Sequence, residues 1–221
     1  IDVGSLTELY GEGGSGKSQL CIQLALNCQL PRHLGGLEGK VIYISSDKPF
    51  PMRRFKQIAK DQFGYLNCTE DFVRNLDVYQ HFKLSNFINF IEKDFISLVR
   101  YSTVRLVIID SIAGIYRNED KYIGRARNIC SIFREIHKLA HEFDFAILVS
   151  NQVTAVPSRN FNDSSILSEN LSTPALGATW SSMVTTRIRI AKTNIVRNFK
   201  IGGKDEQCYI RAMEIEFSPR L

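Results

Sequence analysis

Short apolar runs alternate along the first two thirds of the chain with longer segments of helical character. The runs at 40–45, 105–110 and 145–150 are almost uniformly apolar, which is typical of strands buried on both faces of a sheet, and the other two are shorter and more mixed. The runs lie at residues 6–10, 40–45, 76–80, 105–110 and 145–150. The segments between them predict helices at residues 18–30, 52–63, 84–100 and 127–143.

This alternation predicts an α/β fold with a mostly parallel central sheet and helices on both faces. A Ser/Asn-rich segment follows at residues 153–174, and loops of this length are usually functional. Alternating residues at 182–191 and 208–217 predict two further strands, joined through a charged turn. We expect these two C-terminal strands to be antiparallel.

The composition fits one globular domain. The chain has 221 residues, of which 44% are hydrophobic and 23% charged. The net charge of +5 permits a polyanionic partner without requiring one. Five cysteines without a C-x-x-C pair favour reduced thiols over a disulfide framework. No run of 18 apolar residues is present, so we expect no membrane-spanning segment.

Residues 11–18 read G-E-G-G-S-G-K-S, between a predicted strand and a predicted helix. Glycines let the backbone approach a phosphate closely, and the helix directs free N–H groups at the same place. We expect Lys17 to reach the β and γ phosphates and Ser18 to bind Mg²⁺. The pattern predicts a nucleoside triphosphate site, with a plain glycine-rich turn as the alternative.

Two polar residues follow buried strands. Asp110 ends one strand and places a carboxylate at the edge of the sheet, a ligand that Mg²⁺ prefers, often through water. Gln152 follows the strand at 145–150. An amide in this place can sense the γ-phosphate and transmit its presence to the loop that follows.

Five blocks resemble, in the same order, the ATPase core of the RecA-type recombinase family, and more closely its eukaryotic recombination paralogues. They read LTELYGEGGSGKSQL, LPRHLGGLEGKVIYIS, RLVIIDSIAGIYR, SNQVT and TPALGATWSSMVTTRI. The resemblance covers residues 1–221 as one RecA-like ATPase domain. We expect the helical N-terminal domain of the family, and its final strand and cap segment, to be absent from these residues.

The resemblance assigns nucleotide-binding roles by position. Arg54 would stack on adenine, Ser18 and Asp110 would hold Mg²⁺, and Gln152 would be the nucleotide sensor. The residues that would hold the triphosphate are Gly11, Glu12, Gly13, Gly14, Ser15, Gly16, Lys17, Ser18 and Gln19.

The resemblance also implies two DNA-facing loops, at about residues 117–127 and 153–175. Their candidate phosphate contacts are Arg117, Lys121, Arg125 and Arg127 in the first loop and Arg159 in the second. The alternative is an ordinary solvated surface, and acidic residues in both loops dilute the positive charge.

Asp47 departs from the family pattern. The recombinases of the family have Glu here, which positions and activates the attacking water. Asp is one methylene shorter, so its carboxylate falls short by ~1.5 Å, about one C–C bond. Because a misplacement of ~1 Å can cost ~10²-fold in rate, we expect a catalytic group of Asp47, Lys17 and Gln152 that hydrolyses ATP slowly. A relocated base with a compensating backbone shift is the alternative.

The resemblance thus implies an ATP-binding recombinase paralogue that acts in homologous-recombination DNA repair in the nucleus, with some protein in the cytoplasm. The expected cofactors are ATP and Mg²⁺. The expected partners are a second paralogue of the same fold in a heterodimer, a recombinase filament, and single-stranded or branched DNA, without a membrane. The alternatives are an active DNA-dependent ATPase and strand-exchange recombinase, and a small-molecule phosphotransferase.

Overall fold

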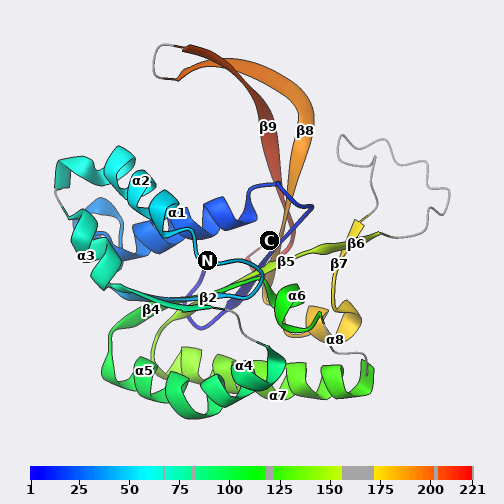
Figure 1. Cartoon of the computed structure of the whole chain (residues 1–221). Helices are drawn as coiled ribbons and strands as arrows, with labels where there is room; N and C mark the ends of the chain where they lie inside the picture. The colour runs from blue at the N-terminus through cyan, green and yellow to red at the C-terminus, as the bar shows by residue number, and fades with distance from the viewer. Residues whose placement is uncertain (67, 81–82, 118–121, 156–171, 202–203, 221) are drawn as a thin grey trace.

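A computed structural model describes the chain except residues 67, 81–82, 118–121, 156–171, 202–203 and 221 (Figure 1). In the described part, a central sheet has the strand order β3-β2-β4-β5-β1-β8-β9, and β6 pairs separately with β7. The strands are β1 (Leu6–Tyr10), β2 (Lys40–Ser45), β3 (Leu76–Gln80), β4 (Val104–Asp110), β5 (Ala146–Asn151), β6 (Val153–Ala155), β7 (Ser172–Pro174), β8 (Thr186–Ile201) and β9 (Lys204–Phe217).

The helices connect these strands and lie outside the sheet. The α-helices are α1 (Lys17–Gln29), α2 (Met52–Phe63), α3 (Thr69–Arg74), α4 (Leu84–Phe90), α5 (Ile96–Tyr101), α6 (Ile112–Ile115), α7 (Tyr122–Glu142) and α8 (Gly177–Ser181). The shorter turns are η1 (Arg32–Leu34) and η2 (Gly64–Leu66), of 3-10 type, and η3 (Ile91–Phe95), a π turn between α4 and α5.

The pairing confirms the predicted α/β fold. Strands β1 to β5 and β8 pair with their neighbours in parallel, whereas β8 and β9 are antiparallel. All carboxyl ends of the parallel strands therefore meet at one edge of the sheet. In such sheets ligands bind outside that edge, so a ligand-binding site is expected there.

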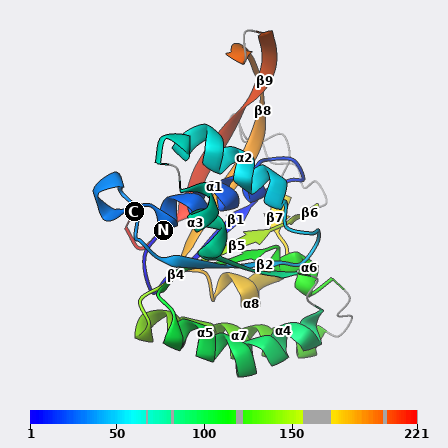
Figure 2. The same ribbon diagram turned by 60° about the vertical axis from the view of Figure 1, so that its left-hand side comes forward.

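Helices cover both faces of the sheet. Helices α1, α2 and α3 lie on one face, and α4, α5, α7 and α8 lie on the other (Figures 1 and 2). Successive strand residues point to opposite faces. On β4, for example, Ile108 packs in the cluster on the α1 face and Ile109 in the cluster on the α7 face. This two-sided burial explains why the strands read as continuous apolar runs.

The C-terminal hairpin is longer than expected. Residues 192–207 were predicted as a charged turn, but β8 continues to Ile201 and β9 begins at Lys204. Figure 2 shows this hairpin extending beyond the helices that cover the sheet. Because its outer part pairs with itself and not with the core, it needs no alternation of apolar residues, and the pattern gave no strand signal there.

Helix α7 also differs from the prediction. It begins at Tyr122, before the expected start at residue 127, so part of the predicted first DNA-facing loop is helical. Helices α3, α6 and α8 were not predicted, since segments of four to six residues are too short to show a helical period. No helix in the described ranges is both long and apolar enough to cross a membrane.

Candidate nucleotide-binding site

The ends of four adjacent strands build one cleft. Strands β2, β4, β5 and β1 are consecutive neighbours in the sheet, and the segments after them converge at its carboxyl edge. A cleft of about 550 Å³ opens there. The predicted site residues that line it are Gly11, Gly13, Gly14, Lys17, Ser18, Asp47, Asp110 and Gln152.

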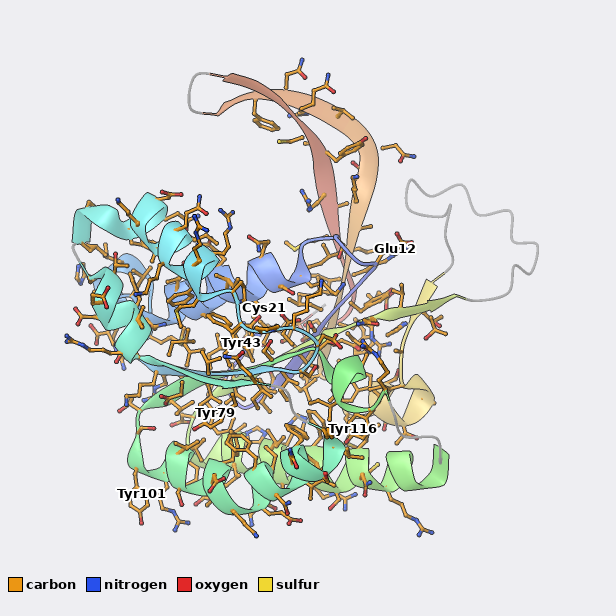
Figure 3. All side chains as sticks on the ribbon, viewed as in Figure 1. Glu12, Cys21, Tyr43, Tyr79, Tyr101 and Tyr116 are labelled. Atoms are coloured by element: carbon orange, nitrogen blue, oxygen red, sulfur yellow. The ribbon has the colours of Figure 1, made fainter. Side chains whose placement is uncertain are left out.

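The phosphate loop joins β1 to α1. Gly16 has φ of 108° and is the N-cap of α1, so the helix begins at Lys17 with its free N–H groups beside the cleft. Gly11 lies against the hairpin, and a Cβ there would be 2.1 Å from the carbonyl oxygen of Ile190. Only glycine fits this close approach between two backbones. Figure 3 shows Glu12 at the outer end of the loop.

The loop offers groups that an anion would satisfy. The hydroxyl of Ser15 is buried and has no hydrogen-bond partner among the described residues. The ammonium of Lys17 donates to the carbonyl oxygens of Gly11 at 2.7 Å and Glu12 at 2.9 Å. Burial lowers the pKa of Lys17, and the carboxylate of Asp110 opposes this shift. A triphosphate fits this cradle, because it supplies acceptors to the loop and negative charge to the lysine.

Asp110 provides the oxygen ligand expected for a magnesium ion. The hydroxyl of Tyr43 donates to its Oδ2 at 2.8 Å, and the hydroxyl of Ser150 donates to its Oδ1. Burial raises the pKa of Tyr43 well above its ordinary value, so this hydroxyl remains a donor. In Figure 3, Tyr43 lies below Cys21 of α1, on the same side of the sheet. With Ser18 on the same cleft, a hydroxyl and a carboxylate form a hard-oxygen donor set that suits Mg²⁺.

The carboxylate of Asp47 is held by donors from three different segments. Its Oδ2 accepts hydrogen bonds from Ser111 Oγ at 2.7 Å and Gln152 Nε2 at 3.0 Å. Its Oδ1 lies 2.7 Å from Arg117 Nη2. Gly114 leaves the necessary space, because a Cβ there would be 2.5 Å from Asp47 Oδ1. The structure therefore brings together Asp47, Gln152 and Arg117, which lie far apart in the sequence.

Arg54 lies beside the phosphate loop but outside the cleft. It is exposed on α2, and its Nε donates to Gln19 Oε1 at 3.0 Å. Its Nη1 donates to Gln57 on the same helix at 2.9 Å. The predicted adenine-binding residue thus contacts the last residue of the predicted triphosphate segment, and it is accessible from solvent.

The candidate DNA contacts are only partly placed. Arg117 follows α6 and turns toward the nucleotide cleft, where it contacts Asp47. Arg127 is exposed on α7, on a helix and not on a loop. Lys121, Arg159 and the side chain of Arg125 lie outside the described residues. The ends of the second predicted loop are ordered as the antiparallel pair β6–β7, with Thr154 opposite Thr173.

Sequence reasoning missed a buried polar network next to the cleft. Glu8 of β1 is fully buried, and its carboxylate accepts from Arg187, Trp180 and Asn151. Trp180 packs edge-on against Phe133, with ring centroids 4.9 Å apart, and its indole N–H also donates to Glu8. A charged residue inside the apolar strand LTELY was the available signal, since a buried carboxylate requires partners.

The fold and the cleft define a RecA-like nucleotide-binding domain, and comparison with known proteins gives the family. The Rad51 family model matches residues 1–204, so the chain belongs to the Rad51 family. This confirms the resemblance found in the sequence. The match covers the phosphate loop, Asp47, Asp110 and Gln152.

Individual relatives refine this result. The chain is 31% identical to the DNA repair protein XRCC3 homolog of Arabidopsis thaliana, over 100% of the chain and 82% of that protein. Residues 30–39 and 174–180 resemble XRCC3 in particular, which agrees with this similarity.

Two further relatives are recombination and repair proteins by name. The chain is 35% identical to the DNA repair and recombination protein RadA of Methanocorpusculum labreanum, over 74% of the chain and 54% of that protein. It is 34% identical to the DNA repair protein RAD51 homolog 1 of Arabidopsis thaliana, over 87% of the chain and 55% of that protein. The chain thus spans about half the length of these two relatives.

Proposed function

We propose that residues 1–221 act as the ATP-binding domain of a recombination paralogue in homologous-recombination DNA repair. One observation carries this proposal: Lys17, Ser18, Asp110, Asp47 and Gln152 line a single cleft. In this cleft, bound ATP–Mg²⁺ would supply a transferable γ-phosphate and a neutralising cation. The similarity to the XRCC3 homolog over the whole chain supports the paralogue assignment.

The chain's own residues divide the work at this site. Lys17 and the N-terminus of α1 would attract the phosphates, Ser18 and Asp110 would hold the cation, and Gln152 would detect the γ-phosphate. Asp47 is the candidate base, and three donors already occupy its carboxylate. Together with the shorter side chain at this position, this supports slow hydrolysis.

The proposal also covers the partners of the protein and its location in the cell. The protein would work in a heteromeric complex with a second paralogue of the same fold, and this complex would assist recombinase–DNA filaments. It would be nuclear, with some protein in the cytoplasm. Its ATP state would control assembly with the partner, and Arg117 would be among its contacts to DNA phosphates.

Titration calorimetry with ATP–Mg²⁺ tests the nucleotide site. Lys17→Ala should weaken binding at least tenfold, whereas Lys60→Ala, which changes an exposed lysine on α2, should bind as the wild type does. Equal affinity of the two variants would contradict the site. Co-purification with the partner paralogue tests the assembly, since a complex that forms equally well with Lys17→Ala and without ATP would contradict ATP control.

The second candidate function is an active DNA-dependent ATPase and strand-exchange recombinase. The contact between Arg117 and Asp47 favours it, because a DNA-facing cation that releases the base on binding DNA would couple DNA to hydrolysis. Single-stranded DNA stimulation of ATP hydrolysis separates the two functions. Strong stimulation that is abolished in Asp47→Asn would support the recombinase and contradict slow turnover.

A further inference from the structure

The buried carboxylate of Glu8 is anchored by three side chains from different elements. Arg187 Nε lies 2.6 Å from Oε2, and Oε1 accepts from Trp180 Nε1 at 2.5 Å and from Asn151 Nδ2 at 2.7 Å. Glu8 and Arg187 are also direct neighbours in the register of β1 and β8. Removing a partner from a buried charge is strongly destabilising, so the carboxylate of Glu8 is held in one position in the sheet.

Asn151 links this carboxylate to the nucleotide cleft. The Nδ2 that bonds Glu8 also donates to the carbonyl oxygen of Ala175 at 2.9 Å. On its other side, Asn151 Oδ1 accepts from the backbone N–H of Gln152 at 2.8 Å. The backbone N–H of Ala175 in turn donates to the carbonyl oxygen of Gln152 at 2.9 Å. One side-chain amide thus connects β1, the end of β5 and the segment after β7.

We propose that Asn151 is a positioning residue, which fixes the backbone of Gln152 and the base of the β6–β7 pair to the buried Glu8. The inference rests on the proposed nucleotide site, because Gln152 acts there. Gln152 leaves the sheet at the carboxyl edge, where no ladder partner holds its N–H. The amide of Asn151 replaces that partner.

A fixed backbone confines the movement of Gln152 to its side chain. Its amide donates to Asp47 at 3.0 Å, and a γ-phosphate in the cleft would compete for the same donor. A hydrogen bond weakens steeply when donor and acceptor lose alignment, so a shift of the Gln152 backbone would weaken its bond to the γ-phosphate. Asn151 therefore supports discrimination of ATP from ADP without touching the nucleotide.

The chain offers a matched pair of variants. Asn151→Ala and Trp180→Phe each remove one donor from the same oxygen, Glu8 Oε1, but only Asn151 also holds Gln152. For each variant, calorimetry gives the affinities for ADP–Mg²⁺ and for adenylyl imidodiphosphate–Mg²⁺. The ratio of these affinities is the readout, and the melting temperature records the stability cost.

Asn151→Ala should lower the ratio of triphosphate to diphosphate affinity about tenfold, because a charge-assisted hydrogen bond to the γ-phosphate is weakened, with ADP affinity unchanged. Trp180→Phe should keep the wild-type ratio at a similar loss of melting temperature. An unchanged ratio in Asn151→Ala, or an equal fall in Trp180→Phe, would overturn the inference alone. Failure of the wild-type chain to bind either nucleotide would overturn the proposed function and this inference with it.

A double-mutant cycle tests the proposal even if the loss of stability in Asn151→Ala affects nucleotide binding. Gln152→Ala removes the sensing amide from an exposed position. If Asn151 acts through Gln152, the double variant should have the same ratio as Gln152→Ala alone. Additive losses would show that Asn151 acts by another route. Where Asn151→Ala does not fold, Asn151→Ser serves in the same cycle.

Discussion

The guanidinium of Arg117 lies 2.7 Å from the carboxylate of Asp47, which lines the candidate nucleotide cleft. Arg117 is more than half exposed, with 57% of its side chain accessible, while Asp47 is 22% accessible. Exposed ion pairs contribute about 0–1 kcal/mol, so this contact is easily exchanged for another anion. The pair connects the candidate base to a residue at the start of the first predicted DNA-facing loop.

Removal of Arg117 should raise basal ATP turnover. In Arg117→Ala, Asp47 Oδ1 becomes available to a water molecule, and up to about 1 kcal/mol of competing interaction is lost, or about fivefold in rate. Steady-state ATPase assays without DNA measure the effect. Arg134→Ala, an exposed arginine on α7, is the control. A large fall in turnover of Arg117→Ala would mean that the arginine assists the reaction.

Lengthening the candidate base should also raise turnover. Asp47→Glu restores the missing methylene and should accelerate hydrolysis by about tenfold to a hundredfold, because the carboxylate moves ~1.5 Å toward the attacking water. Single-turnover hydrolysis with saturating enzyme measures the chemical step. Asp47→Asn should remove the residual activity. Equal rates for all three proteins would exclude Asp47 as the base.

Gly114 should be as sensitive as a catalytic residue although it carries no side chain. A Cβ at this position would lie 2.5 Å from Asp47 Oδ1 and 2.3 Å from Ser46 Oγ, so Gly114→Ala must displace the carboxylate. Turnover should fall about a hundredfold while ADP affinity stays within about threefold. Gly64→Ala is the matched control, since its Cβ would meet only Lys60 Cγ, at 3.9 Å. Wild-type turnover in Gly114→Ala would show that Asp47 tolerates the shift.

Alkaline pH should destabilise the fold through Cys28. Burial raises the pKa of this thiol from 9.0 to about 12. Between these values the unfolded chain loses the proton and the folded chain keeps it, so the free energy of unfolding falls as pH rises, by up to about 1.4 kcal/mol per pH unit. Urea unfolding between pH 8 and 11 should show a shallower decline for Cys28→Ala. Parallel curves for the two proteins would contradict this cause.

The position of the cleft could be predicted from the sequence, because its polar residues lie at the ends of apolar runs. Asp110 and Gln152 follow buried strands, and parallel strands bring such positions to one edge of the sheet. The bounds of the buried strands β1 and β2 were predicted correctly, and so were those of β3, an edge strand that is only partly buried. The predicted bounds of β4 and β5 differ from the observed ones by one residue.

Other parts of the site depend on contacts that no local pattern encodes. Ser111 and Tyr43 each donate to one of the two carboxylates of the cleft, but both lie in ordinary apolar contexts in the sequence. The network around Glu8 joins residues 8 and 187, which only the strand order β1–β8 makes neighbours. The path of Arg117 toward Asp47 likewise depends on α6, a helix of four residues.

The close approach between Gly11 and Ile190 changes how variants of the phosphate loop are to be interpreted. A side chain at Gly11 would strike the backbone of β8 at 2.1 Å, so its first effect falls on the join between loop and hairpin and not on the nucleotide. We expect a variant at Gly11 to behave as a folding defect, which low temperature or a stabilising background should rescue. We expect a variant at Lys17 to keep the fold and lose nucleotide binding, so neither remedy should restore it.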